Sequence, residues 1–132
     1  MSPRRLTTRR ADRSAARSRR QIAEKYLEVA QIAALEDGVA INVTIGVAVL
    51  AGVAAGDAIC IDALGERYSG TDHAAAADLL TRVDAEMGKY LRALTHVKSA
   101  SHYGDNILTE TDRLRAIRQA TALVLEAARR TT

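Results

Sequence analysis

The stretch from Gly38 to Gly56 contains no charged side chain, and this feature limits most strongly the folds open to the chain. It belongs to an apolar helix that we expect over Ile41–Leu64, ending at Gly65. A helix that is apolar on nearly every side is typical of one surrounded by other helices. The sequence therefore predicts an all-α protein, an up-and-down bundle of four to five helices.

The length of this uncharged stretch also matches a membrane span. However, Asn42 and Thr44 lie within it, Ala and Gly make up much of it, and Asp57 follows it directly. These residues disfavour insertion into a lipid bilayer. We therefore expect a buried central helix and no association with a membrane.

Helical periodicity and capping residues predict the elements around the central helix. Thr109 and Asp112 have the spacing of a capping box at the start of the last helix. No stretch shows the alternation of a strand, and short loops are expected throughout. The further helices that we expect run over Ser14–Glu36, from Thr71 or Asp72 to an interruption or bend at Gly88, from there to about Ser101, and from Thr109 onward.

Small residues recur every four positions along the central helix, at Ala48, Gly52 and Gly56. Each glycine inside a helix costs about 1 kcal/mol relative to alanine, and close packing is the expected compensation. The row predicts a partner helix that approaches closely. That partner belongs either to the same chain or to a second copy.

Positive charge is concentrated in residues 1–20, which hold eight arginines and one acidic residue and carry +7. Since the whole chain carries +3, the remaining residues carry −4. We expect residues 1–13 to form a disordered Arg-rich arm and residues 14–132 to form the helical domain. Such an arm favours nucleic-acid binding; a solvated extension, or a start site set too far upstream, is the alternative. The arginines concerned are Arg4, Arg5, Arg9, Arg10, Arg13, Arg17, Arg19 and Arg20.

Cys60 is the only cysteine, so the chain has no pair for an internal disulfide. A single thiol favours a reducing compartment, and no apolar signal-peptide segment follows the Arg-rich start. The sequence therefore predicts a cytoplasmic protein. The three histidines, His73, His96 and His102, lack the spacing of metal ligands, so no metal or cofactor is expected.

Asp57 interrupts the apolar face of the central helix. An ionised carboxylate in such a position needs a partner, and Lys98, Arg67 and His73 are within reach. We interpret Asp57, His73 and Arg67 as a buried polar cluster. The cluster is either a structural ion pair or a site whose carboxylate acts as a base or orients a ligand.

Basic and titratable side chains gather near the end of the fourth expected helix. Arg92 and His96 share one helix face, as do Lys98 and His102, and Tyr103 follows. A histidine can take the proton from an RNA 2′-hydroxyl while a cation holds the phosphate. The candidate catalytic residues are therefore His102, Lys98, Tyr103 and Arg92; a polar helix end with ordinary surface charges is the alternative.

Three segments resemble the HEPN superfamily, and more closely its small actinobacterial members: AGDAICIDALGERYSGTDHAAAADLL, LRALTHVKSASHYG and a last helix ending in VLEAARR. The resemblance covers Gln21–Arg130. It implies a four- or five-helix bundle, frequently a homodimer, in a bacterial defence, stress or toxin–antitoxin setting. It also implies a cognate antitoxin or nucleotidyltransferase as a possible partner.

Active members of this superfamily are metal-independent RNases with an Arg and a His near the penultimate helix, often followed by Tyr. Lys98 with His102 and Tyr103 is the nearest match here, with Lys where the family has Arg. The first hypothesis is a protein that binds RNA or a protein partner. The alternatives are a metal-independent endoribonuclease acting through these residues and a DNA-associated protein acting through the Arg-rich arm.

Overall fold

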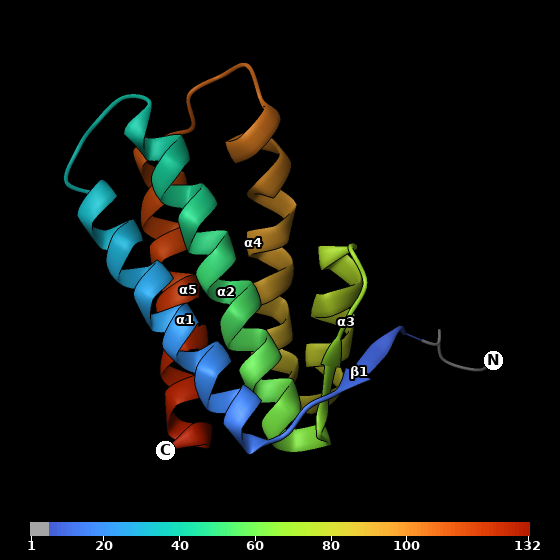
Figure 1. Ribbon diagram of the computed structural model, residues 1–132. Coiled ribbons are helices and arrows are strands. Elements are labelled where there is room, and N and C mark those ends of the chain that lie inside the picture. Colours follow the sequence, from blue (N-terminus) through green and yellow to red (C-terminus); the bar gives the residue numbers. More distant parts are fainter. Residues whose placement is uncertain (1–5) are drawn as a thin grey trace.

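Five helices and one two-stranded antiparallel ladder make up the computed structural model, which describes residues 6–132 apart from the side chains at 99–101 and 103. The predicted all-α bundle is confirmed. The elements in order are β1 (Thr8–Arg10), α1 (Arg13–Ala33), α2 (Ala40–Leu64), β2 (Glu66–Tyr68), α3 (His73–Val83), α4 (Ala85–Tyr103) and α5 (Glu110–Thr131) (Figure 1).

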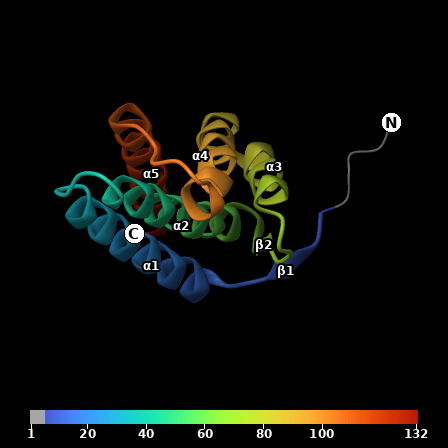
Figure 2. The same cartoon turned by 90° about the horizontal axis from the view of Figure 1, so that it is seen from above.

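Helix α2 lies at the centre of the bundle and contacts each of the other four helices. Figure 2 shows α1 covering one side of α2, with α4 and α5 on the other side and α3 beside α4. By length and composition α2 could cross a membrane, yet 83% of its most apolar window is buried inside the structure. Its apolar surface therefore meets side chains of the same chain, as expected for a central helix.

The glycines of α2 make room for leucines of α4. A Cβ atom added at Gly52 would lie 2.6 Å from Cδ1 of Leu94, and one added at Gly56 would lie 3.1 Å from Cδ2 of Leu91. Both leucines are buried. The partner helix predicted from the row of small residues is therefore α4 of the same chain.

The predicted caps define the starts of two helices. The Asp72 carboxylate accepts a hydrogen bond from the backbone N–H of Ala74 at 3.0 Å, so α3 begins at His73. Thr109 and Asp112 form the predicted capping box at the start of α5. Local sequence signals were therefore sufficient at both positions.

The predicted interruption at Gly88 is wrong, because α3 ends at Val83 and the break between the two helices falls at Asp84. The Asp84 carboxylate accepts hydrogen bonds from the backbone N–H groups of Glu86 and Met87 and so caps the start of α4. Gly88 lies inside α4, where a Cβ would meet the backbone of Thr81 at 2.6 Å. The glycine permits close contact between α3 and α4 rather than a break.

The ladder of β1 and β2 corrects the expectation that strands are absent and, for residues 6–13, the expectation of disorder; residues 1–5 of the predicted arm lie outside the described residues. Thr8 Oγ1 donates to Glu66 Oε2 at 3.1 Å, and Arg9 lies opposite Arg67. Three residues are too few to show a clear alternation, and the two strands are far apart in the chain. The described start of the chain is thus attached to the α2–α3 connection.

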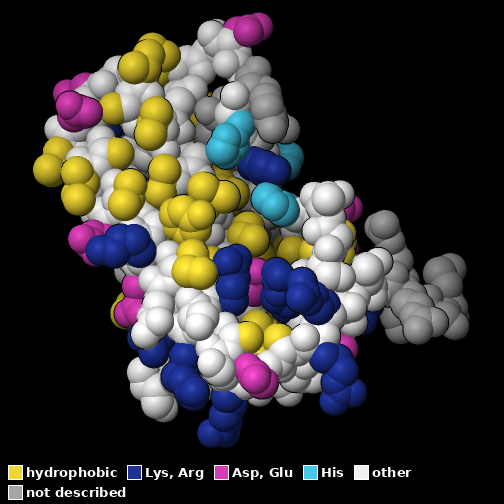
Figure 3. All heavy atoms as spheres, viewed as in Figure 1, with side chains coloured by type: hydrophobic (Ala, Val, Ile, Leu, Met, Phe, Trp, Pro, Cys, Tyr) yellow, Lys and Arg dark blue, Asp and Glu magenta, His cyan; other side chains and the backbone are white. Residues whose placement is uncertain are grey.

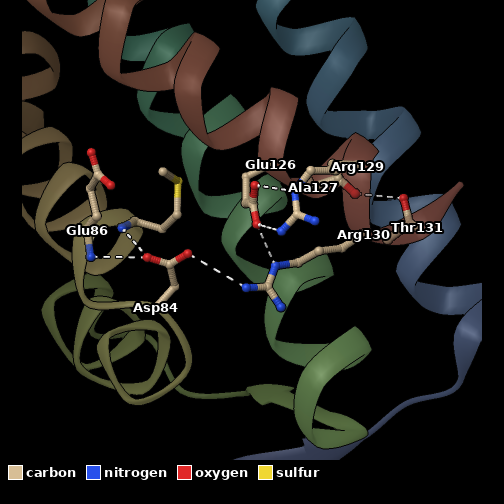
Figure 4. Close-up of polar contacts among 8 residues, drawn as sticks. Asp84, Glu86, Glu126, Ala127, Arg129, Arg130 and Thr131 are labelled. Carbon is tan, nitrogen blue, oxygen red and sulfur yellow. Dashed lines mark hydrogen bonds and ion pairs between the residues drawn. The ribbon is translucent and has the colours of Figure 1, made fainter.

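One ion pair joins the end of α5 to the junction between α3 and α4 (Figure 4). Arg130 Nη2 lies 3.7 Å from Asp84 Oδ2, and Arg130 Nε donates to Glu126 Oε1 at 2.9 Å. Hydrogen bonds from Arg129, and then from Arg130, lower the pKa of the Glu126 carboxyl. This network holds the start of α4, the helix that carries most of the candidate site.

Candidate functional site

A hollow of about 450 Å³ lies between the start of α3 and the helix α4. We call it the histidine hollow. Figure 3 shows the histidine side chains gathered in one region around a basic side chain. Arg92, His96 and Lys98 of the predicted cluster therefore lie together, and His73 joins them. The complete lining is Thr71, Asp72, His73, Ala74, Arg92, Thr95, His96 and Lys98.

His73 is the first residue of α3 and is half-buried in this hollow. Its Nδ1 atom is buried and has no hydrogen-bond partner in the described part of the chain. Burial lowers the pKa of His73; the charges of Lys98 and His102 lower it further, and Asp72 opposes them. The imidazole is therefore neutral at pH 7 and can accept a proton or a hydrogen bond.

Lys98 and His102 lie one helical turn apart on α4, close enough to act electrostatically on His73. Lys98 is half-buried, whereas His102 is exposed. The imidazole of His102 lies against α2, since a Cβ at Gly46 would be 3.3 Å from His102 Cε1. The side chain of Tyr103 lies outside the described residues.

A second hollow, of about 610 Å³, lies between α4 and α5. We call it the α4–α5 hollow; Arg92 and His96 line it as well as the histidine hollow. Its walls combine aliphatic side chains with polar groups. The spacing of residues on α4 alone did not reveal it, because α5 supplies four of its nine lining residues. The complete lining is Lys89, Arg92, Ala93, His96, Val97, Asp112, Arg115, Ala116 and Gln119.

Arg92 is held between the two hollows by an ion pair with Asp78 of α3. The two side chains are 53% and 46% exposed, so the pair orients the guanidinium but leaves it open to solvent. An exposed pair of this kind contributes little to stability. The guanidinium therefore remains available for a ligand.

The buried polar cluster predicted around Asp57 exists, but its members differ. The Asp57 carboxylate, 8% exposed, accepts hydrogen bonds from Arg19 at 3.0 Å and from Arg67 at 3.4 Å. Burial raises the pKa of Asp57, while the charges of the two arginines oppose that shift. Arg67 was predicted and Arg19 was missed, because Arg19 comes from α1. His73 lines the histidine hollow instead, so its inclusion in this cluster is corrected.

Much of the Arg-rich segment is attached to the domain. Arg9 and Arg10 belong to β1. Arg20 donates to Glu24 Oε1 at 2.8 Å and to Thr131 Oγ1 at 3.2 Å. The other predicted arm residues are Arg13 and Arg17, which are exposed on α1, Arg19, which is paired with Asp57, and Arg4 and Arg5, which lie outside the described residues.

Two kinds of chemistry receive no support from the described side chains. Cys60 is buried, and burial raises the pKa of its thiol to about 12, so the thiolate that acts as a nucleophile is not formed at neutral pH. Over the described residues, no group of three or more His, Cys, Asp or Glu side chains forms a candidate metal site. The charged and titratable groups of the hollows are the better candidates.

The chain matches no family model, no curated protein and no solved structure. The resemblance to the HEPN superfamily stays a prediction. The geometry and charge of the hollows are the features that indicate a function.

Proposed function

We propose that this protein binds single-stranded RNA across the histidine hollow and the α4–α5 hollow. The observation that carries the proposal is that Arg92 and His96 line both hollows, so one ligand can occupy the two at once. Lys98 adds a second cation to the histidine hollow, where Asp72 is the one carboxylate in the lining. Excess positive charge attracts the phosphates that supply most nucleic-acid affinity.

The two hollows suit different parts of a nucleotide. The histidine hollow has a cationic lining that suits a phosphate. The α4–α5 hollow presents the aliphatic side chains of Ala93 and Val97 to a base, and Asp112 and Gln119 offer hydrogen-bond partners for its edge. Unpaired bases can be turned outward into such a hollow, which favours single-stranded RNA over a duplex.

Fluorescence anisotropy with a labelled single-stranded RNA of about 12 nucleotides tests this proposal. We expect Lys98→Ala and Arg92→Ala each to weaken binding by about tenfold, the loss of one charge-assisted contact. Lys25→Ala is the matched control, because it removes an exposed charge on α1 outside both hollows. Equal RNA affinities for the unaltered protein and all three variants would contradict the proposal. A protein partner would then be the ligand to test.

Metal-independent RNA cleavage is a second candidate, favoured by the neutral imidazole of His73 near Lys98 and His102. A neutral histidine would take the 2′-hydroxyl proton, and the 2′-oxygen would attack phosphorus. The 5′-oxygen would leave and take a proton from solvent water, giving a 2′,3′-cyclic phosphate. Lys98 would hold the phosphate oxygens.

Incubation of RNA with the purified protein in EDTA tests cleavage. Loss of cyclic-phosphate product in each of His73→Ala, His102→Ala and Lys98→Ala is the result that supports it. Absence of product from the unaltered protein, or product unchanged in all three variants, leaves binding without chemistry. Either outcome is read beside the anisotropy measurement, which reports binding alone.

We also propose that two copies associate through an apolar face of α1 and α2. Val29 is 44% exposed on α1, and Val43 and Leu50 are 57% and 36% exposed on α2, the helix that packs beside it. Exposed apolar surface of this kind marks an interface. Exposed Arg17 lies near the start of α1 and exposed Asp37 follows its end, so an antiparallel pair of copies would bring opposite charges together.

Light scattering during size-exclusion chromatography tests this association. The expected result is a dimer for the unaltered protein and a monomer for Val43→Glu. Leu125→Glu is the matched control, because Leu125 is 65% exposed on α5. If the unaltered protein is a monomer, the proposed association of two copies is wrong. The predicted antitoxin or nucleotidyltransferase is then the partner to test.

A further inference from the structure

A third hollow, of about 360 Å³, lies where β1, β2 and the first turns of α1 meet. We call it the arginine hollow, because Arg9, Arg10, Arg19 and Arg67 line it. Asp12 is the one carboxylate in the lining. The lining therefore combines four guanidinium groups with a single negative charge.

The carboxylate of Asp12 is already engaged. Its Oδ1 accepts a hydrogen bond from the backbone N–H of Ala15 at 2.9 Å and so caps α1. An N-terminal helix cap satisfies N–H groups that have no partner within the helix. The Asp12 carboxylate thus caps α1 and, over the described residues, forms no ion pair with the arginines that line the hollow.

Arg9 and Arg67 stand directly opposite each other in the β1–β2 ladder. Residues at opposite ladder positions project to the same face, with their Cβ atoms about 5 Å apart, and like charges in this arrangement are destabilising. An anion bound between the two guanidinium groups would remove that repulsion. The register of the ladder therefore favours a negative ligand at this point.

Asp57 lies beneath the hollow and orients two of its arginines. It accepts hydrogen bonds from Arg19 of α1 and from Arg67 of β2. Arg19 also has a buried Nε–H without an acceptor in the part of the chain that the structure describes. One buried carboxylate cannot neutralise two guanidinium groups, so the arginines retain capacity for a further anion.

We propose that the arginine hollow binds a phosphate group. A guanidinium presents paired N–H donors that match phosphate oxygens, and four arginines from three elements line the hollow. Arg9 and Arg10 are exposed, and Asp57 holds the other two arginines in place. This site differs from the histidine hollow and does not depend on the RNA proposal.

The phosphate has two possible sources, a free phosphate compound or the backbone of a nucleic acid. Figure 3 shows basic side chains below the histidines on the same face of the molecule. A strand bound in the histidine hollow could therefore continue toward this part of the surface. The experiment distinguishes the two sources by competition.

Isothermal titration calorimetry with sodium diphosphate tests the site on the full chain. We expect saturable binding that Arg9→Ala and Arg10→Ala each weaken by about tenfold, as for the loss of a charge-assisted contact. Both side chains are exposed, and circular dichroism checks that the variants fold. Lys25→Ala, an exposed charge outside the hollow, is expected to bind diphosphate as the unaltered protein does.

Competition with RNA assigns the source. If single-stranded RNA displaces diphosphate and Arg9→Ala also weakens RNA binding, the site holds a backbone phosphate. If RNA fails to compete, the ligand is a free phosphate compound. Absence of diphosphate binding, or equal binding by Arg9→Ala and the unaltered protein, overturns the proposal. Lys98→Ala separates the two hollows, because it is expected to weaken RNA binding and leave diphosphate binding unchanged.

Discussion

The histidine hollow and the arginine hollow both collect cations, but their charged side chains are held in different ways. In the histidine hollow, Arg92 pairs with Asp78, and both side chains are about half exposed. In the arginine hollow, Arg19 and Arg67 converge on Asp57, which is 8% exposed. One hollow is an adjustable surface, whereas the other is built onto the core.

The difference has consequences for ligand binding. Groups held by a buried carboxylate keep their positions before a ligand arrives, so less conformational freedom is lost on binding. The side chains of the histidine hollow are freer, and they include two imidazoles that can donate or accept hydrogen bonds. The arginine hollow should therefore bind a small anion with little dependence on pH, and the histidine hollow should adapt to a larger ligand.

The largest expected effect concerns Asp57. Asp57→Asn leaves Arg19 and Arg67 without their counter-charge and should lower the free energy of unfolding by about 3 kcal/mol, the low end for breaking a buried pair. Urea unfolding followed by circular dichroism measures it. A change below about 0.5 kcal/mol would show that the arginine hollow is not anchored in the core.

The next effect concerns the salt dependence of RNA binding. Arg92→Ala should lower the slope of log affinity against log salt concentration by about 0.7 if the guanidinium contacts one phosphate of a single strand. Anisotropy titrations over a series of salt concentrations give this slope. An unchanged slope in Arg92→Ala, with Lys25→Ala as the control, would remove Arg92 from the RNA interface.

A smaller effect concerns pH. Burial holds the pKa of His73 below its ordinary value of 6.5, so the unfolded chain binds the proton more readily than the folded protein does. The stability from neutral His73 is present above pH 6.5 and is lost as the pH falls toward the folded pKa. His73→Gln should therefore reduce the fall in unfolding free energy between about pH 7.5 and about pH 5.5. An equal fall in unfolding free energy for His73→Gln and the unaltered protein, measured by urea unfolding at the two pH values, would contradict the lowered pKa of His73.

The smallest expected effect is at Asp78. Asp78→Ala removes the exposed partner of Arg92 and should lower the free energy of unfolding by less than about 1 kcal/mol. The same urea experiment compares it directly with Asp57→Asn. An equal loss of unfolding free energy in the two variants would contradict the distinction between an exposed ion pair in one hollow and a buried one in the other.

Elements that are determined by residues adjacent in the sequence were predictable from the sequence. Examples are the uncharged run that forms α2 and the capping box at Thr109. The short strands depend on pairing with each other, and the position of the break, at Asp84 and not at Gly88, depends on the contact between α3 and α4. Gly88 suggested a break, but its role is to admit Thr81 of α3.

The candidate site divides in the same way. The spacing on α4 predicted that Arg92 and His96 share a face, and these residues line two hollows. Arg19 as a partner of Asp57, and Arg115 of α5 as part of the α4–α5 hollow, could not be predicted from spacing. Each lies on a different helix from the residues that it meets and is distant from them in sequence. Only the packing of the bundle brings them into contact.

The most direct test of RNA binding in the histidine hollow uses the three histidines of the chain as probes. Nuclear magnetic resonance of the imidazole groups, assigned by single His→Gln variants, is recorded while single-stranded RNA is added. We predict saturable shifts that are largest for His73 and His96. Imidazole signals that do not move at RNA concentrations that saturate the anisotropy titration would contradict RNA binding in the histidine hollow. The ligand would then bind elsewhere on the protein.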